Sequence, residues 1–128
     1  KTSAGYRLVV MNRRYSPTDG KTYELLKDLG SDPLYIRLCR TQECFRARLQ
    51  PKPWRCGTTR PPHTFPQENS EQRRNHQHWL KGYELASQDY TVCRKVAELG
   101  NGTFDTEVLQ VLAMHDKHVL GLASKPLA

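Results

Sequence analysis

The sequence has no long hydrophobic run. Its apolar stretches are only a few residues long, as in Leu8-Val9-Val10-Met11, and its mean hydropathy is −0.76. A membrane helix needs about 20 consecutive apolar residues and a signal-peptide core about 7–15, so we expect neither in this chain. With 26% charged and 37% hydrophobic residues, the composition is that of a globular protein. We therefore expect one cytoplasmic domain over residues 1–128, with no membrane partner.

Cysteine is sparse, and no two of the four cysteines form a C-x-x-C pair. This spacing excludes the common zinc motifs and the dense disulfide frameworks of small secreted domains. We expect reduced, partly buried thiols and no cofactor. A zinc site is the alternative, and its four candidate ligands lack diagnostic spacing: Cys44, Cys56, His63 and His76.

Motifs of common enzyme classes are also missing. The chain contains no Walker phosphate loop, no G-x-S-x-G nucleophile motif and no carboxylate pair placed for acid–base catalysis. Catalytic residues are therefore unknown, and we expect this chain alone not to be an enzyme. The enzymatic alternative is a nuclease or phosphohydrolase that uses His115, Asp116 and His118 with a divalent metal. The simpler interpretation is a half-buried His115 on an apolar face and an exposed His118.

Acidic residues are scarce in the first half of the chain. The whole chain has 20 Lys and Arg against 13 Asp and Glu, a net charge of +7. Residues 1–64 hold thirteen basic and five acidic side chains, whereas residues 65–128 hold seven and eight. Clustered Lys and Arg favour a polyanionic partner, because neutralising phosphates releases counterions. This balance predicts nucleic-acid binding.

Two segments have the patterns of β-strands. Residues 4–11 are rich in β-branched and apolar side chains, and residues 44–50 alternate between apolar and basic side chains. Two strands do not make a stable sheet, so upstream strands, a third strand or a partner chain must complete it. We therefore predict an α+β fold with a small, mainly antiparallel sheet covered by helices. A strand at the start of a chain without Met also predicts a fragment of a longer protein.

Helices are expected in both halves. Ser16-Pro17 has the pattern of a helix start and Gly30 that of a helix end, and Asp32-Pro33 predicts the start of a second short helix. Apolar spacing predicts a long helix over about 70–99 and another over about 105–120. The expected organisation is a basic α/β half (1–56), a loop (57–69) and a helical half (70–121).

The densest basic stretch predicts the binding residues. Arg46 and Arg48 are two apart on the predicted strand, so their guanidinium groups should point the same way, toward phosphates. Trp54 lies between two basic residues, which is typical of an aromatic side chain that stacks on an unpaired base. The predicted nucleic-acid-binding residues are Arg37, Arg40, Arg46, Arg48, Lys52, Trp54 and Arg55. The predicted partner is single-stranded nucleic acid.

Part of the chain resembles a known family. Three segments occur in a suggestive order: Lys1-Thr2-Ser3-Ala4-Gly5-Tyr6-Arg7-Leu8-Val9, Leu29-Gly30-Ser31-Asp32-Pro33, and Phe45-Arg46-Ala47-Arg48-Leu49 followed by Pro51-Lys52. Residues 1–52 thereby resemble the nucleotide-binding half of archaeo-eukaryotic-type primases. The resemblance implies a sheet of the RNA-recognition-motif type and a degenerate or accessory primase-like module. Arg7 stands where that family has a nucleotide-binding His, and the family's acidic metal-binding strand would precede residue 1.

The function predicted from the sequence is thus phosphate-backbone binding through a basic strand and loop, with little sequence preference. Besides the metal-dependent phosphohydrolase, a second alternative stays open. The chain would then be a protein-interaction subunit, whose sheet is completed by another protein or by a second copy.

Overall fold

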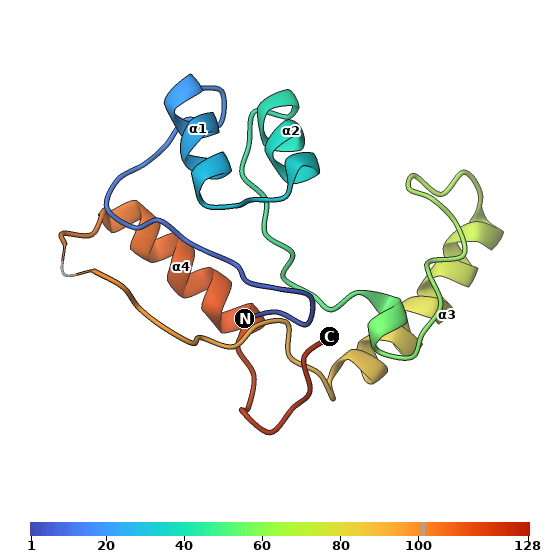
Figure 1. Ribbon diagram of the computed structural model, residues 1–128. Helices are drawn as coiled ribbons and strands as arrows, with labels where there is room; N and C mark the ends of the chain where they lie inside the picture. The colour runs from blue at the N-terminus through green and yellow to red at the C-terminus, as the bar shows by residue number, and fades with distance from the viewer. Residues whose placement is uncertain (101) are drawn as a thin grey trace. The chain divides into compact units, whose positions relative to one another are not determined.

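The computed structural model describes residues 1–100 and 102–128. Within these residues the secondary structure is helical, and the helices are joined by long irregular segments (Figure 1). The elements in chain order are α1 (Gly20–Asp28), α2 (Pro33–Thr41), the 3₁₀ helix η1 (Pro53–Arg55), α3 (Ser70–Ser87) and α4 (Thr106–Val119). None of these helices is long and apolar enough to cross a bilayer.

The predicted α+β fold is wrong, because the described residues contain no β-sheet. Backbone pairing is limited to three isolated bridges, Thr2 with Gly5, Thr91 with Leu127 and Cys93 with Leu120. The segments 4–11 and 44–50 have strand-like composition but form no strand. Side-chain pattern favours an extended backbone, and a sheet additionally requires a second extended segment in register. Neither segment has such a ladder here.

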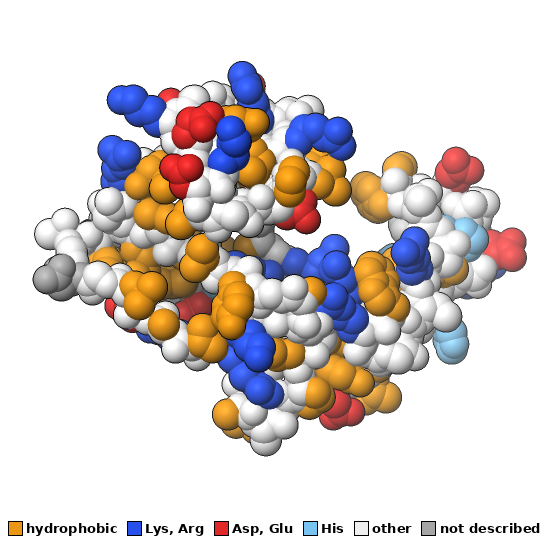
Figure 2. All heavy atoms as spheres, viewed as in Figure 1, with side chains coloured by type: hydrophobic (Ala, Val, Ile, Leu, Met, Phe, Trp, Pro, Cys, Tyr) orange, Lys and Arg blue, Asp and Glu red, His pale blue; other side chains and the backbone are white. Residues whose placement is uncertain are grey.

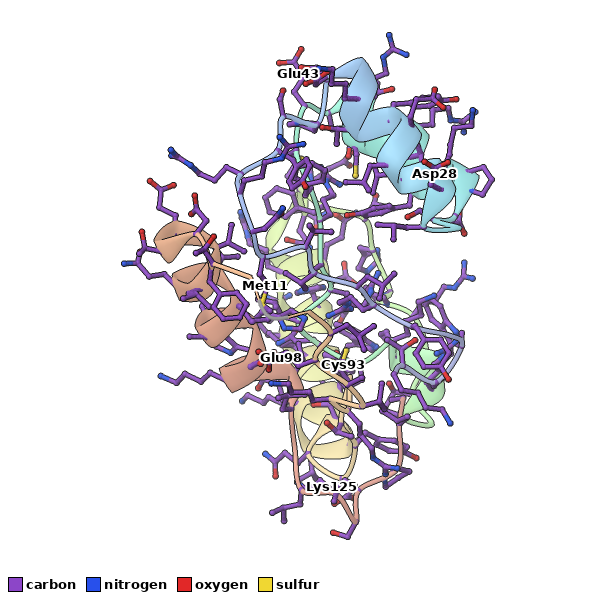
Figure 3. The ribbon with its side chains drawn as sticks, turned by 60° about the vertical axis from the view of Figure 1, so that its left-hand side comes forward. Met11, Asp28, Glu43, Cys93, Glu98 and Lys125 are labelled. Atoms are coloured by element: carbon purple, nitrogen blue, oxygen red, sulfur yellow. The ribbon has the colours of Figure 1, made fainter. Side chains whose placement is uncertain are left out.

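The described chain divides into two compact units. Unit 1 comprises Lys1–Leu8, Leu49–Gly100 and Met114–Ala128, and unit 2 comprises residues 9–48 and 102–113. Each unit therefore takes segments from both of the halves expected from the sequence. Figure 3 labels residues from both units, such as Met11, Asp28 and Glu43 in unit 2 and Cys93, Glu98 and Lys125 in unit 1.

Unit 2 contains α1 and α2, which lie side by side (Figure 1). The Asp19 carboxylate caps α1 by accepting from the backbone N–H of Lys21, so the helix begins after Asp19 instead of near Ser16. Gly30 follows α1 with a φ of 67°, the left-handed conformation that glycine adopts without strain. Asp32 caps α2 and Pro33 occupies its first turn, which confirms the predicted start of that helix.

Unit 1 contains η1, α3 and the C-terminal turn of α4. Asn69 caps α3, which starts at Ser70 as predicted but ends at Ser87 instead of near residue 99. The chain beyond α3 makes other hydrogen bonds: the N–H of Thr91 donates to Pro126 O, and the N–H of Cys93 donates to Val119 O. These long-range bonds replace the helical ones. They bring Val92 and Cys93 against Val119 in a small buried cluster.

The fourth helix matches its prediction closely. Asp105 precedes α4 and its carboxylate accepts from the N–H groups of Glu107 and Val108. At the other end, the buried Thr91 hydroxyl donates to the carbonyl of Val119 (2.8 Å) and accepts from the N–H of Gly121 (2.8 Å). A side chain outside the helix therefore satisfies the backbone groups that its last turn exposes.

Candidate nucleic-acid interface

The positive charge is concentrated in unit 1. This unit carries twelve Lys and Arg against six Asp and Glu, whereas unit 2 carries eight against seven. Lys and Arg side chains are prominent on the face of the molecule in Figure 2. The excess of basic residues that the sequence shows in residues 1–64 is shared by the two units, and the larger part of it lies on the unit that holds η1 and α3.

An exposed indole lies at the centre of this unit's most basic segment. Trp54 is the middle residue of η1 and is 50% exposed. Pro53 begins the turn, and its carbonyl accepts from the N–H groups of Cys56 and Thr58 and from the Thr58 hydroxyl. These bonds hold residues 53–55 in a 3₁₀ turn. As a result, the ring of Trp54 is presented to solvent on a braced turn.

Two cations lie against this ring. Lys52 Nζ is 5.6 Å and Arg60 Cζ 5.0 Å from the centroid of the Trp54 ring, both within the range of cation–π attraction. We call Lys52, Trp54 and Arg60 the indole site. Residues 49–67 contain no Asp or Glu, so this stretch supplies no acidic neighbour to neutralise it. The adjacent Arg55 donates a hydrogen bond to the Ser3 hydroxyl in the same unit.

Helix α3 braces the segment that carries the indole site. The Tyr83 hydroxyl donates to Pro51 O (2.7 Å), and the Trp79 Nε1–H donates to Thr59 O (3.0 Å). The two rings are themselves stacked, 5.2 Å apart and 3° from parallel. Because Pro51 and Thr59 lie before and after η1, both ends of the segment are attached to one helix. Trp79 and Tyr83 are thus positioning residues for Trp54.

The predicted binding residues are divided between the two units. Lys52, Trp54 and Arg55 belong to unit 1, and Arg60 is the neighbour that the sequence analysis left out of the site. The other four predicted residues belong to unit 2. Arg37 and Arg40 lie on α2, whereas Arg46 and Arg48 line a shallow, open depression together with Phe45 and Ala47. Arg46 and Arg48 therefore border one hollow, although they are on no strand.

The enzymatic candidate residues have a different arrangement. His115 is partly buried, with Nε2 2.6 Å from Arg7 Nη1 and Nδ1 2.8 Å from Asp116 Oδ1. His118 lies on the exposed side of α4. Both ring nitrogens of His115 are thus engaged by protein groups. This geometry is that of an anchored histidine, in which the Nε2 atom faces the Arg7 guanidinium and is not directed to solvent.

The zinc candidates are also separated between the units. Cys44 belongs to unit 2, and Cys56, His63 and His76 belong to unit 1. Across residues 1–100 and 102–128, no group of three or more His, Cys, Asp and Glu side chains could hold a metal ion. All four cysteines are free thiols, and three of them are buried: Cys39, Cys56 and Cys93.

Burial predicts the order in which these thiols react. It raises the pKa of Cys56 and Cys93, although Arg7 opposes the shift at Cys93, and a protonated thiol is a poor nucleophile. We expect iodoacetamide to label the partly exposed Cys44 first and the three buried thiols only after denaturation. Peptide mass spectrometry of a labelling time course measures this order. Labelling of Cys93 as fast as Cys44 in the native protein would contradict it.

The chain was compared with protein-family models, curated proteins and solved structures, and none of them matches.

Proposed function

We propose that this protein binds single-stranded nucleic acid, with the indole site of unit 1 as the contact that holds a base. The observation that supports this most directly is the half-exposed Trp54 ring with Lys52 and Arg60 against it. An aromatic face takes up a base, and neighbouring cations neutralise the flanking phosphates. The three side chains of the indole site combine both interactions within nine residues of chain.

An unpaired base is the better partner for such a ring than a duplex. In a duplex each base is stacked on its neighbours, so its face is not accessible to a side chain, whereas single strands offer that face freely. Contacts to phosphates and to π-faces carry little sequence information. The proposal therefore includes weak sequence preference and a strong dependence of affinity on salt.

Exposure of Trp54 also favours nucleic acid over an acidic protein partner. If the basic residues served to pair with carboxylates, the aromatic ring would contribute most by packing inside its own unit. Instead the other tryptophan, Trp79, packs on Tyr83, and Trp54 faces solvent. The resemblance of residues 1–52 to primases stays a prediction, and the proposal does not depend on it.

The salt dependence of binding tests the role of the two cations. A single strand loses about 0.7 in the slope of log K against log salt for each phosphate contact removed. We expect the double variant Lys52→Ala/Arg60→Ala to have a slope shallower by about 1.4 than the wild type, measured by fluorescence anisotropy of a labelled oligothymidylate. The matched control is Lys21→Ala/Lys27→Ala on α1, which removes the same charge from unit 2. Equal slopes in the two double variants would contradict the assignment.

The arginines of unit 2 are tested in the same assay. Arg46 and Arg48 were predicted to contact phosphates, and both line the open depression. If they form a second phosphate contact, Arg46→Ala/Arg48→Ala reduces the salt slope as well. A slope equal to that of the α1 control variant would confine binding to the indole site.

A further inference from the structure

A chain of three polar side chains connects the N-terminal segment of unit 1 to α4. Arg7 Nη1 lies 2.6 Å from His115 Nε2, and His115 Nδ1 lies 2.8 Å from Asp116 Oδ1. We call these residues the Arg7 triad. The His115 side chain is 12% exposed and the Asp116 side chain 31%, so the triad is partly shielded from water.

The chemistry of arginine assigns the protons in this triad. A guanidinium can only donate, so the Nε2 atom of His115 must accept from Arg7. The proton of the neutral imidazole therefore resides on Nδ1, which donates to the Asp116 carboxylate. Each of the two hydrogen bonds has a charged partner, which makes it stronger than a bond between neutral groups.

Protonation of His115 is incompatible with one of these bonds. The imidazolium carries a proton on both nitrogens, so Nε2 would meet Arg7 as donor against donor and as cation against cation. Asp116 keeps its bond and stabilises the added charge. Other ionisable groups also act here: Cys93, after α3, interacts electrostatically with Arg7, Asp116 and the N-terminal amine of Lys1, and Lys95 interacts with Asp116. The N-terminal amine also donates to the carbonyl of Arg94 (2.6 Å). Histidine and the α-amino group are the types among these whose charge ordinarily changes near or between pH 5 and 8, and acidification adds charge to the amine without removing its donor.

The N-terminal segment has further attachments within unit 1, and they provide a reporter. The carbonyl of Lys1 accepts from the N–H of Arg94 (2.9 Å), and the Ser3 hydroxyl accepts from Arg55 beside Trp54. Displacement of residues 1–8 would therefore deprive the Arg94 amide of its acceptor and the Arg55 guanidinium of its hydroxyl partner.

We propose that the Arg7 triad is a proton-sensitive attachment, which holds residues 1–8 on α4 while His115 is neutral and releases them when His115 is protonated. The direction of the pH dependence follows from the protonation of His115: the attached form binds one proton fewer than the released form. The attachment is therefore favoured at high pH and lost as the pH falls. This inference stands on the geometry of unit 1 and does not rest on the proposed function.

Hydrogen exchange of the Arg94 amide, followed by NMR on the full chain between pH 8 and pH 5, tests the inference. After correction for intrinsic rates, we expect the protection of this amide to fall about tenfold or more with acidification, the size expected for a lost charge-assisted bond. The fall should have the same midpoint as the titration of the His115 ring resonances. A different midpoint, or constant protection, would overturn the proposal.

The variant His115→Gln distinguishes an effect of protonating His115 from an effect of protonating another group. The glutamine amide oxygen reaches about as far as Nε2 and accepts from Arg7 at every pH, because it does not titrate. We expect the protection of Arg94 in this variant to be independent of pH. The same acid-induced loss in His115→Gln would assign the effect to another group and contradict the triad. If the variant does not fold, the comparison of midpoints in the wild-type chain decides alone.

Discussion

Replacing Trp54 by alanine is expected to weaken the binding of a single-stranded oligonucleotide about 5- to 150-fold, because base stacking on an aromatic side chain contributes about 1–3 kcal/mol. The ring of Trp54 is half exposed and belongs to no buried cluster, so its removal should leave the free energy of unfolding nearly unchanged. The loss should be equal at every salt concentration, since the indole carries no charge. Anisotropy titrations at several salt concentrations measure both quantities.

Phe65→Ala is the matched control for this loss. Phe65 is an aromatic residue of the same unit and is 88% exposed, but it lies outside the indole site. Its removal should leave the affinity unchanged. A similar loss in Phe65→Ala and Trp54→Ala would show that any exposed aromatic side chain serves equally well. A change of salt slope in Trp54→Ala would show that the variant disturbs the neighbouring cations.

Replacing Thr91 by valine is expected to lower the free energy of unfolding by about 1–3 kcal/mol, the usual cost of leaving one buried polar group without a partner. Thr91 is only 3% exposed, and valine has nearly the same volume, so the substitution removes the hydroxyl without opening a cavity. The N–H of Gly121 loses its acceptor, whereas the carbonyl of Val119 loses one donor and keeps the N–H groups of Val92 and Cys93. Urea denaturation followed by circular dichroism measures the change.

The control for Thr91→Val is Thr64→Val, the same substitution at an exposed position of unit 1. We expect it to change the free energy of unfolding by less than about 0.5 kcal/mol, as is usual for surface sites. Equal urea midpoints of unfolding for the two variants would contradict the role of Thr91 as the cap of α4. If the free energy of unfolding depends less steeply on urea concentration only in Thr91→Val, the end of α4 unfolds separately.

Local signals in the sequence predicted several helix ends correctly, although α1 begins after Asp19 and not near Ser16. Asp32-Pro33, Gly30 and Asp105 act within a few residues of their own position, and the structure has the corresponding caps and the left-handed glycine where they were expected. The end of α3 could not be predicted in this way. It depends on hydrogen bonds from residues 91 and 93 to residues 126 and 119, which no local pattern reveals.

The predicted sheet failed for a related reason. The alternation of apolar and basic side chains over residues 44–50 is compatible with a strand, but a strand is defined by its pairing. Glu43, directly before this segment, has a φ of 50°, so the chain turns sharply as it leaves α2. An α+β interpretation from composition therefore mistook extended loops for strands.

The candidate site was predictable only in part. Lys52, Trp54 and Arg55 are close in sequence, so the sequence alone predicts that they lie together. The approach of Arg60 to the ring depends on the turn after η1. The bracing bonds from Trp79 and Tyr83 join residues 20 and 32 positions apart, whereas apolar spacing had predicted only a helix over this stretch.

The most direct test of nucleic-acid binding at the indole site is tryptophan fluorescence. The chain has two tryptophans, so Trp54→Phe leaves Trp79 as the only indole. We predict that oligothymidylate quenches the emission of the wild-type protein at about 50 mM salt, that higher salt reverses the quenching, and that Trp54→Phe shows little quenching. Equal quenching in both proteins would place the base elsewhere. Absence of any binding at low salt would contradict the proposed function and favour a protein-interaction subunit with a basic surface.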